Sequence, residues 1–309
     1  MHTLEIPDRK IFKEFASEIE EMIGEQYIYF VELILKYQNG DISAQMLKVL
    51  LVKNLLGIHI GLKYFFLSKE TQQQINGEIF RLSEQMESFF YDDVRDGKQV
   101  KSIKLSFVKN LIPKIYKNLY GPGDALSDIT FCEYRRAHTF YRDYLKTRNS
   151  DSMNHLIAIL YRPAKRFLWI RKYFPGFDGQ NRRPFTAKSN PILLDRRAAK
   201  IARLPLSIRY GIFLWFCGCE EYLVKGTPVI DGQEIDLSVL YKESENASKE
   251  PNIGLVGLLY TLSESKVFGS IEETDQQNLY DVMARLYQVV LQQREMDDKF
   301  EKVRNGTNS

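Results

Sequence analysis

The chain has 309 residues, enough for one large domain or two of ordinary size, and its formal net charge is only +3. A hydrophobic content of 44% with 27% charged residues predicts a folded, soluble protein. Three cysteines provide no disulfide framework, the N-terminus lacks a signal-peptide pattern, and the longest apolar run, residues 210–219, is too short to span a bilayer. These features exclude a disulfide-rich secreted protein and a membrane-spanning one, and they predict a cytoplasmic location.

Helical periodicity dominates the first part of the chain. Apolar residues recur at three- and four-residue steps over residues 8–38, 43–57 and 71–95, which predicts three helices. Residues 100–120 fit either a short strand followed by a helix or a helix divided by Pro113. The sequence Gly-Pro-Gly-Asp at residues 121–124 is a strong breaker, so it is the best internal boundary.

The second part also predicts helices, interrupted by prolines. Thr130 and Glu133 match a capping box at the start of a helix. Further helices are expected over residues 151–162, 192–204, 206–225, 253–268 and 274–296. Residues 229–235 contain Asp231-Gly232, a tight-turn signal, and predict one small β-hairpin.

The predicted fold is therefore mainly α, a multi-helix globular bundle with one small β-hairpin near residues 229–235. We expect an N-terminal helical lobe over residues 1–120 and a C-terminal lobe over residues 121–309, either separate or packed as a single domain. Residues 162–209 lie in the C-terminal lobe.

These residues 162–209, the basic segment, carry most of the positive charge. The segment contains 13 lysines and arginines against two acids, Asp178 and Asp195, a net charge of +11. The other 261 residues hold 30 bases and 38 acids, a net of −8. A local field of this sign favours an anionic partner or an acidic face of the same protein.

No catalytic or metal-binding signature is present in the sequence. Cys217 and Cys219 are two apart within an apolar helix, so their side chains diverge and they are expected to be buried small hydrophobes. His138 lacks an acid at helical spacing, which favours a structural histidine. Phosphate loops, nucleophile elbows and dinucleotide-binding patterns are also missing. The sequence predicts no metal, no cofactor and no enzymatic activity, although a site assembled from distant residues stays open.

The basic segment interleaves arginines with aromatic residues, a mixture found both in protein interfaces and in nucleic-acid grooves. Arginine outnumbers lysine nine to four, and arginine suits bidentate contacts with carboxylates or phosphates. Three alternatives stay open: a protein interface, a nucleic-acid interface, and charges paired within the protein or merely solvated. The candidate partner-binding residues are Arg162, Arg166, Trp169, Arg171, Arg182, Arg183, Arg196 and Arg197. We expect the loop at residues 174–190, with Arg182 and Arg183, to be the most exposed part.

Residues 133–216 resemble proteins of tailed-phage and prophage tail loci. The sequence EYRRAHTFYRDYLKTRNSDSMNHLIAILYRP is similar to a helix ending in aromatic-Asp-Tyr, a linker and a leucine-rich helix ending in Tyr-Arg-Pro. The later stretches RPF and DRRAAKIARLPLSIRYGIFLWF are similar to the charged helix, Leu-Pro break and aromatic helix that follow in those proteins. The resemblance implies a helical tail-assembly accessory protein, chaperone-like and without enzymatic activity.

The leading hypothesis is a non-catalytic interaction or assembly protein that docks an acidic protein partner through the basic segment, in the host cytoplasm or in a phage particle. The first alternative is a nucleic-acid-binding protein that uses the same residues. The second is a helical enzyme whose site is assembled from distant residues and is not visible in the sequence; a deep pocket around His138 would favour it.

Overall fold

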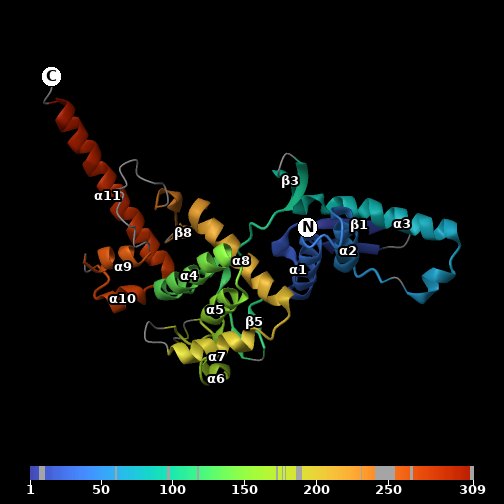
Figure 1. Cartoon of the computed structure of the whole chain (residues 1–309), viewed down its shortest axis with the longest axis horizontal. Coiled ribbons are helices and arrows are strands. Elements are labelled where there is room, and N and C mark those ends of the chain that lie inside the picture. Colours follow the sequence, from blue (N-terminus) through green and yellow to red (C-terminus); the bar gives the residue numbers. More distant parts are fainter. Residues whose placement is uncertain are drawn as a thin grey trace. The chain divides into compact units, whose positions relative to one another are not determined.

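A computed structural model describes residues 1–6, 11–59, 61–95, 98–116, 118–171, 173–175, 177, 179–185, 190–230, 232–240, 255–264 and 267–306. The chain is mainly helical, as the sequence predicts (Figure 1). It forms two compact units: the first comprises Met1–Ile112 and Pro205–Trp215, the second Pro113–Leu204 and Phe216–Ser309. The predicted lobes at residues 1–120 and 121–309, and the arrangement as a bundle, stay predictions.

Three helices form the body of the first unit: α1 (Gly24–Gln38), α2 (Ala44–Leu56) and α3 (Lys69–Ser83). The side chain of Ser43 caps α2 by accepting from the amide of Met46, and Gly57 ends it in the left-handed conformation at φ 64°. The apolar stripe of α1 is buried, with Phe30, Val31 and Ile34 fully covered. Short 3-10 turns complete the helical part of this unit: η2 (Ile19–Glu21), η3 (Leu62–Phe66) and η4 (Glu84–Phe89).

The helix predicted over residues 8–38 is wrong in its first part. Strand β1 (His2–Ile6) pairs antiparallel with β2 (Ile11–Phe15), and α1 begins only at Gly24. Residues 2–6 and 11–15 pair at five positions, from His2 opposite Phe15 to Ile6 opposite Ile11, and this pairing between segments outweighs the local helical spacing.

The helix predicted over residues 71–95 also ends early. β3 (Phe90–Arg95) and β4 (Lys98–Ile103) form a second antiparallel hairpin in which Phe90 lies opposite Ile103. Residues 100–120 accordingly contain the end of β4 and two short strands further on, and no helix among the described positions. The expectation of a single hairpin is therefore wrong, because both of these hairpins join the predicted one, formed by β8 (Val229–Ile230) and β9 (Gln233–Glu234). Asp231, in its predicted turn, lies outside the described residues.

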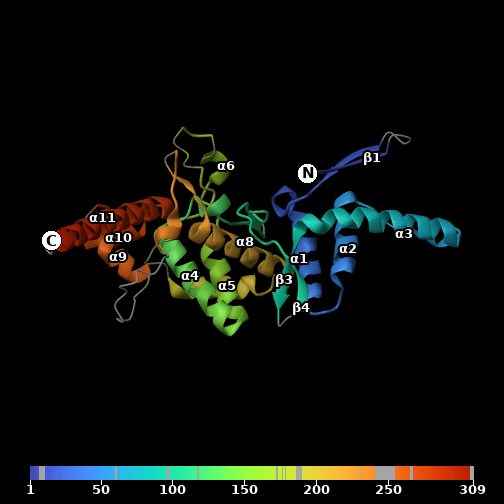
Figure 2. The ribbon, with the colours of Figure 1, turned by 90° about the horizontal axis from the view of Figure 1, so that it is seen from above.

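The second unit is built around α4 (Phe131–Thr147) and α5 (Ser150–Leu160), which pack side by side (Figure 2). Helix α7 (Pro191–Ile201) packs on α5. A three-stranded sheet of order β5-β6-β7 lies in the same unit. Its strands are β5 (Lys114–Ile115), β6 (Leu119–Tyr120) and β7 (Arg162–Pro163). The other elements of this unit are η5 (Asp124–Leu126), α6 (Leu168–Arg171), η6 (Leu237–Leu240), α9 (Leu255–Glu264), α10 (Ile271–Asp275) and α11 (Leu279–Gly306).

Helix α8 (Leu206–Lys225) contributes its first half to the first unit and its second half to the second unit. In the first unit, the indole Nε1 of Trp215 donates to the carbonyl oxygen of Val108 at 2.8 Å, and the Tyr27 hydroxyl donates to Gly211 at 2.7 Å. Among the described residues, no helix combines the length and apolar character that a membrane crossing requires.

Candidate functional site

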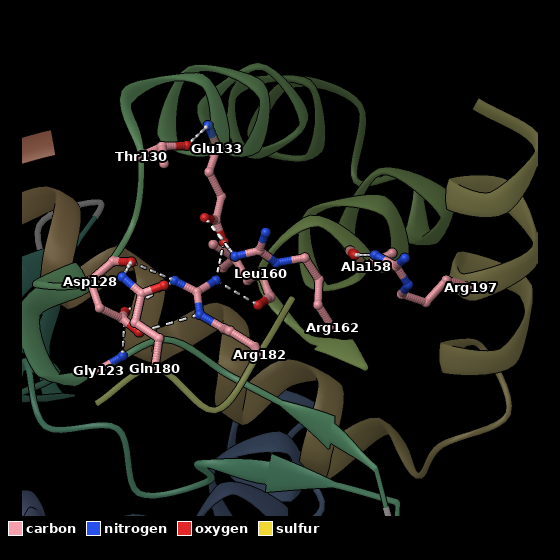
Figure 3. Close-up of polar contacts among 10 residues, drawn as sticks. All are labelled: Gly123, Asp128, Thr130, Glu133, Ala158, Leu160, Arg162, Gln180, Arg182 and Arg197. Carbon is pink, nitrogen blue, oxygen red and sulfur yellow. Dashed lines mark hydrogen bonds and ion pairs between the residues drawn. The ribbon is translucent and has the colours of Figure 1, made fainter. Parts of the chain in front are cut away.

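The basic segment divides into a buried part and an exposed part, and the buried part centres on Glu133. Glu133 lies in the first turn of α4, where its amide donates to the capping hydroxyl of Thr130, as the capping-box pattern predicts. Its carboxylate does not return to the cap. It points into the unit, fully buried, and accepts from the guanidinium groups of Arg162 and Arg182 (Figure 3).

Arg182 is 1% exposed and every nitrogen of its guanidinium donates a hydrogen bond. Nη1 contacts the Glu133 carboxylate and also donates to the Leu160 carbonyl at 3.2 Å. Nη2 and Nε reach the Asp128 carboxylate at 3.0 and 3.4 Å, and Nη2 also meets the Asp128 carbonyl at 3.1 Å. Burial acts to lower the pKa of Arg182, but Glu133 and Asp128 outweigh it and raise that pKa. Arg182 therefore joins the loop before α4, α4 itself and the end of α5.

Arg162 is 4% exposed and lies on β7. Its Nη2 donates to both carboxylate oxygens of Glu133, at 2.9 and 2.8 Å. Burial lowers the pKa of Arg162 to about 10, with the neighbouring Arg182 and Arg197 adding to the effect. The group thus keeps its charge at neutral pH. Neither Arg162 nor Arg182 is available to a partner at the surface, which corrects the expectation that both line a docking surface.

The doublet Arg182-Arg183 splits because its backbone is extended. Ala164 and Arg182 form an antiparallel bridge, and the amide of Arg183 donates to the carbonyl of Pro163 at 3.0 Å. Successive side chains in extended backbone point to opposite sides. Arg182 therefore enters the core while Arg183 stays on the surface, where its Nε donates to the Ala164 carbonyl at 3.0 Å. The expectation that the pair forms the most exposed part of the segment is wrong for Arg182.

The two adjacent arginines of helix α7, Arg196 and Arg197, also differ in burial. Arg196 is exposed, whereas Arg197 is half-buried and its Nη1 donates to the Ala158 carbonyl of α5 at 2.7 Å. Burial lowers the pKa of Arg197, and Arg183 adds to this effect. Asp195, one of the two acids of the segment, accepts from His155 at 3.1 Å, and Asp178 lies outside the described residues.

The exposed aromatic residues of the segment lie together in chain order with two exposed arginines. We call this stretch the aromatic surface and define it as Arg166, Phe167, Trp169, Arg171, Tyr173 and Phe174. Its four rings are 67%, 73%, 88% and 62% exposed in chain order. Phe167, Trp169 and Tyr173 line a hollow of about 500 Å³ whose floor includes Leu168. Arg166 and Arg171 are exposed and form no ion pair with any described residue. Of the eight residues expected to bind a partner, the structure places Arg166, Trp169 and Arg171 here.

Phe167 adopts φ 56°, in the left-handed region, immediately before α6. A bulky side chain is uncommon there, and the strain costs about 1–2 kcal/mol. Because the Phe167 ring is exposed, burial of the ring does not offset this strain. Such strain often marks a functional segment.

His138 is a structural residue in this geometry. Its Nδ1 lies 3.0 Å from the Glu220 carboxylate, and its ring stands between those of Tyr134 and Tyr141. Neither Asp143 nor Glu133, the acids considered from the sequence, is its partner. Cys219 is buried, as expected, whereas Cys217 is only partly buried; burial raises the pKa of the Cys217 thiol to about 12. Among the described residues, no cluster of three metal-ligating side chains forms.

The importance of Glu133 was missed in the sequence. Glu133, Ala137 and Phe140 stand at helical steps of four and three, so this acid lies on the apolar stripe of α4. A lone carboxylate on an apolar stripe requires a buried cationic partner, and that signal points to the arginines.

The comparisons with known proteins found no relative of this chain. No protein-family model matches the chain, and neither the curated proteins nor the solved structures contain a significant match. The likeness to phage tail proteins therefore stays a prediction.

Proposed function

We propose that this chain is a non-catalytic interaction protein that docks an acidic protein partner through the aromatic surface. In this proposal the helices of the second unit form the bundle that supports the surface. The observation that carries the proposal is the exposure of four aromatic rings together with two exposed arginines, Arg166 and Arg171, on one short segment.

The aromatic rings favour a protein partner. Trp, Tyr and Arg dominate the energetically important positions of protein interfaces. A hollow of about 500 Å³ bordered by Phe167, Trp169 and Tyr173 can take an apolar side chain, while the arginines meet surrounding carboxylates. The free surface exposes more aromatic area than solubility favours, and a partner would cover it.

The positive charge of the basic segment favours a partner with negative charge. The basic segment has a net charge of +11, and Glu133 and Asp128 offset only its buried arginines, Arg162 and Arg182. Arg166 and Arg171 stay uncompensated. An acidic partner would be steered to this surface and turned away from the remaining chain, whose net charge is −8.

Assembly of a phage tail is the setting that the resemblance over residues 133–216 suggests. An accessory or chaperone-like protein of this kind would act in the host cytoplasm or in the particle and would hold the acidic partner until it is incorporated. This part of the proposal depends on the sequence resemblance alone.

Affinity purification of the tagged full chain from its source cells tests the proposal. The variant R166E with R171E should lose an acidic co-purifying protein at unchanged helicity, because two attractive charges become repulsive. The matched control is R142E with K146E, two exposed cations of α4 in the same unit, which should retain that protein. Retention by the first variant, or equal loss in the control, would contradict the proposal.

Single-stranded nucleic acid is the second candidate, because bases stack on exposed rings flanked by arginines. The few uncompensated cations of the aromatic surface weigh against it, since tight non-specific binding uses roughly 6–10 phosphate contacts. Fluorescence anisotropy with a labelled 20-nucleotide single-stranded DNA decides between the two. Binding at low salt that falls steeply with added salt would replace the protein partner with nucleic acid.

A further inference from the structure

A second concave site lies in the second unit, apart from the aromatic surface. It is a pocket of about 210 Å³ between β7, the backbone at residues 183–185 and the first turns of α7. Its cationic lining is Arg162, Arg183 and Arg197, and its apolar walls include Phe185, Leu193 and Leu194. None of the described lining residues is acidic. We call it the arginine pocket.

Arg162, which lines this pocket, has unused hydrogen-bond donors. Its Nη2 serves Glu133, but Nε and Nη1 are buried and have no hydrogen-bond partner. A buried charged donor without an acceptor destabilises the folded state, so an acceptor that reached these nitrogens would be bound favourably. Arg182, on the other side of Glu133, uses every nitrogen. Of the two arginines that share Glu133, only Arg162, which lines the pocket, therefore keeps unused donors.

The other two arginines are held in place by backbone carbonyls. Arg197 uses Nη1 on Ala158, and Arg183 uses Nε on Ala164, which leaves the remaining donors of each guanidinium. Burial lowers the pKa of Arg197 and of Arg162, and mutual repulsion among the three cations contributes to both shifts. All three side chains line the same pocket.

Helix α7 adds to the positive electrostatic potential that the three arginines create in the pocket. Asn190 caps it by accepting from the Ile192 amide, and Asn190, Leu193 and Leu194 line the pocket. The positive end of the helix dipole thus faces the three arginines. An anion with several oxygens would accept from guanidinium groups on different elements at once.

We propose that the arginine pocket binds a phosphate group, either as free phosphate or as the terminal group of a small phosphomonoester. The pocket volume admits a phosphate with a small organic group, and the walls of Phe185, Leu193 and Leu194 suit an apolar attachment. The pocket does not use Arg166, Trp169 or Arg171, so the proposal stands independently of the partner docked by the aromatic surface.

Isothermal titration calorimetry of the full chain with inorganic phosphate and with phenyl phosphate, at ionic strength matched with sodium chloride, tests this site. We expect R183Q and R197Q each to raise the Kd about tenfold or more, since each removes a charge-assisted hydrogen bond. R166Q with R171Q, which removes two exposed arginines outside the pocket, should leave the Kd unchanged. R183Q alters an exposed side chain, so it keeps the test informative if R197Q disturbs packing on α5.

Comparing the affinities for inorganic phosphate and phenyl phosphate shows whether the natural ligand is free phosphate or a phosphomonoester. Equal affinity for both indicates free phosphate, and tighter binding of phenyl phosphate indicates an ester whose organic part uses the apolar walls. The proposal is overturned if neither ligand binds, if R183Q and R197Q bind as tightly as the unaltered chain, or if benzoate binds as tightly as phenyl phosphate.

Discussion

The buried network around Glu133 and the exposed aromatic surface are drawn from one basic segment and from the same residue types. In the network, Arg162 and Arg182 are 4% and 1% exposed and share one carboxylate. On the aromatic surface, Arg166 and Arg171 are exposed beside rings that remain in solvent. The difference teaches that an arginine-rich, aromatic-rich composition does not itself mark an interface. The position of each arginine relative to buried acids decides its role.

The largest effect is expected from removing the charge of Glu133. E133Q leaves two buried guanidinium groups without their shared carboxylate, and breaking a buried ion pair costs about 3–5 kcal/mol. Urea unfolding followed by circular dichroism measures the loss. E221Q is the matched control, because Glu221 forms an exposed pair with Lys225 at 3.0 Å, and the loss there should stay below about 0.5 kcal/mol. Equal losses would show that the network is not structural.

A gain of stability is expected from F167G. Glycine adopts φ 56° without the strain of a bulky side chain, so the free energy of unfolding should rise by about 1 kcal/mol. The same substitution removes one of the exposed rings and should weaken partner binding. Thermal unfolding and the purification assay are measured on the same variant. A loss of stability would mean that the ring of Phe167 supports the fold.

A smaller, pH-dependent effect is expected at Glu87 in the first unit. Hydrogen bonds from Lys101 and Lys48 lower the pKa of Glu87 below its ordinary value of 4.5. A carboxyl whose pKa is lower in the folded state stabilises above its unfolded pKa and loses that contribution as the pH falls through the folded value. E87Q should therefore cost less than about 1 kcal/mol at pH 7, since this carboxylate is half-exposed, and nothing at pH 2. An equal difference at both pH values contradicts the assignment.

No stability effect is expected from W169F. The two tryptophans differ sharply, with Trp169 73% exposed and Trp215 2% exposed. Iodide should quench the emission of Trp169 more strongly than caesium does, because the surrounding arginines attract the anion. W169F should abolish that quenching and leave the blue-shifted emission of Trp215, within about 0.5 kcal/mol of the original stability. Quenching that survives the substitution would place Trp215 in solvent.

Helical periodicity and capping signals predicted the mainly α fold and the starts of α2, α4 and α7. They failed at residues 2–15 and 90–103, where strand pairing between segments overrides local helical spacing.

The site was predictable only as a segment. Composition located the positive charge and the exposed Arg166, Trp169 and Arg171. It did not separate Arg182 from Arg183, because that separation depends on a bridge to Ala164, 18 residues earlier in the chain. Nor did it connect Arg162 with Glu133, although the place of this acid on an apolar stripe indicated a buried cation.

The most direct test compares R182Q with R183Q, the same substitution at adjacent positions. The free energy of unfolding should fall by about 3–5 kcal/mol for R182Q, which removes a buried charge bonded to Glu133 and Asp128. For R183Q it should change by less than about 0.5 kcal/mol. Equal changes in the two variants would contradict the division of the basic segment into a buried network and an exposed surface.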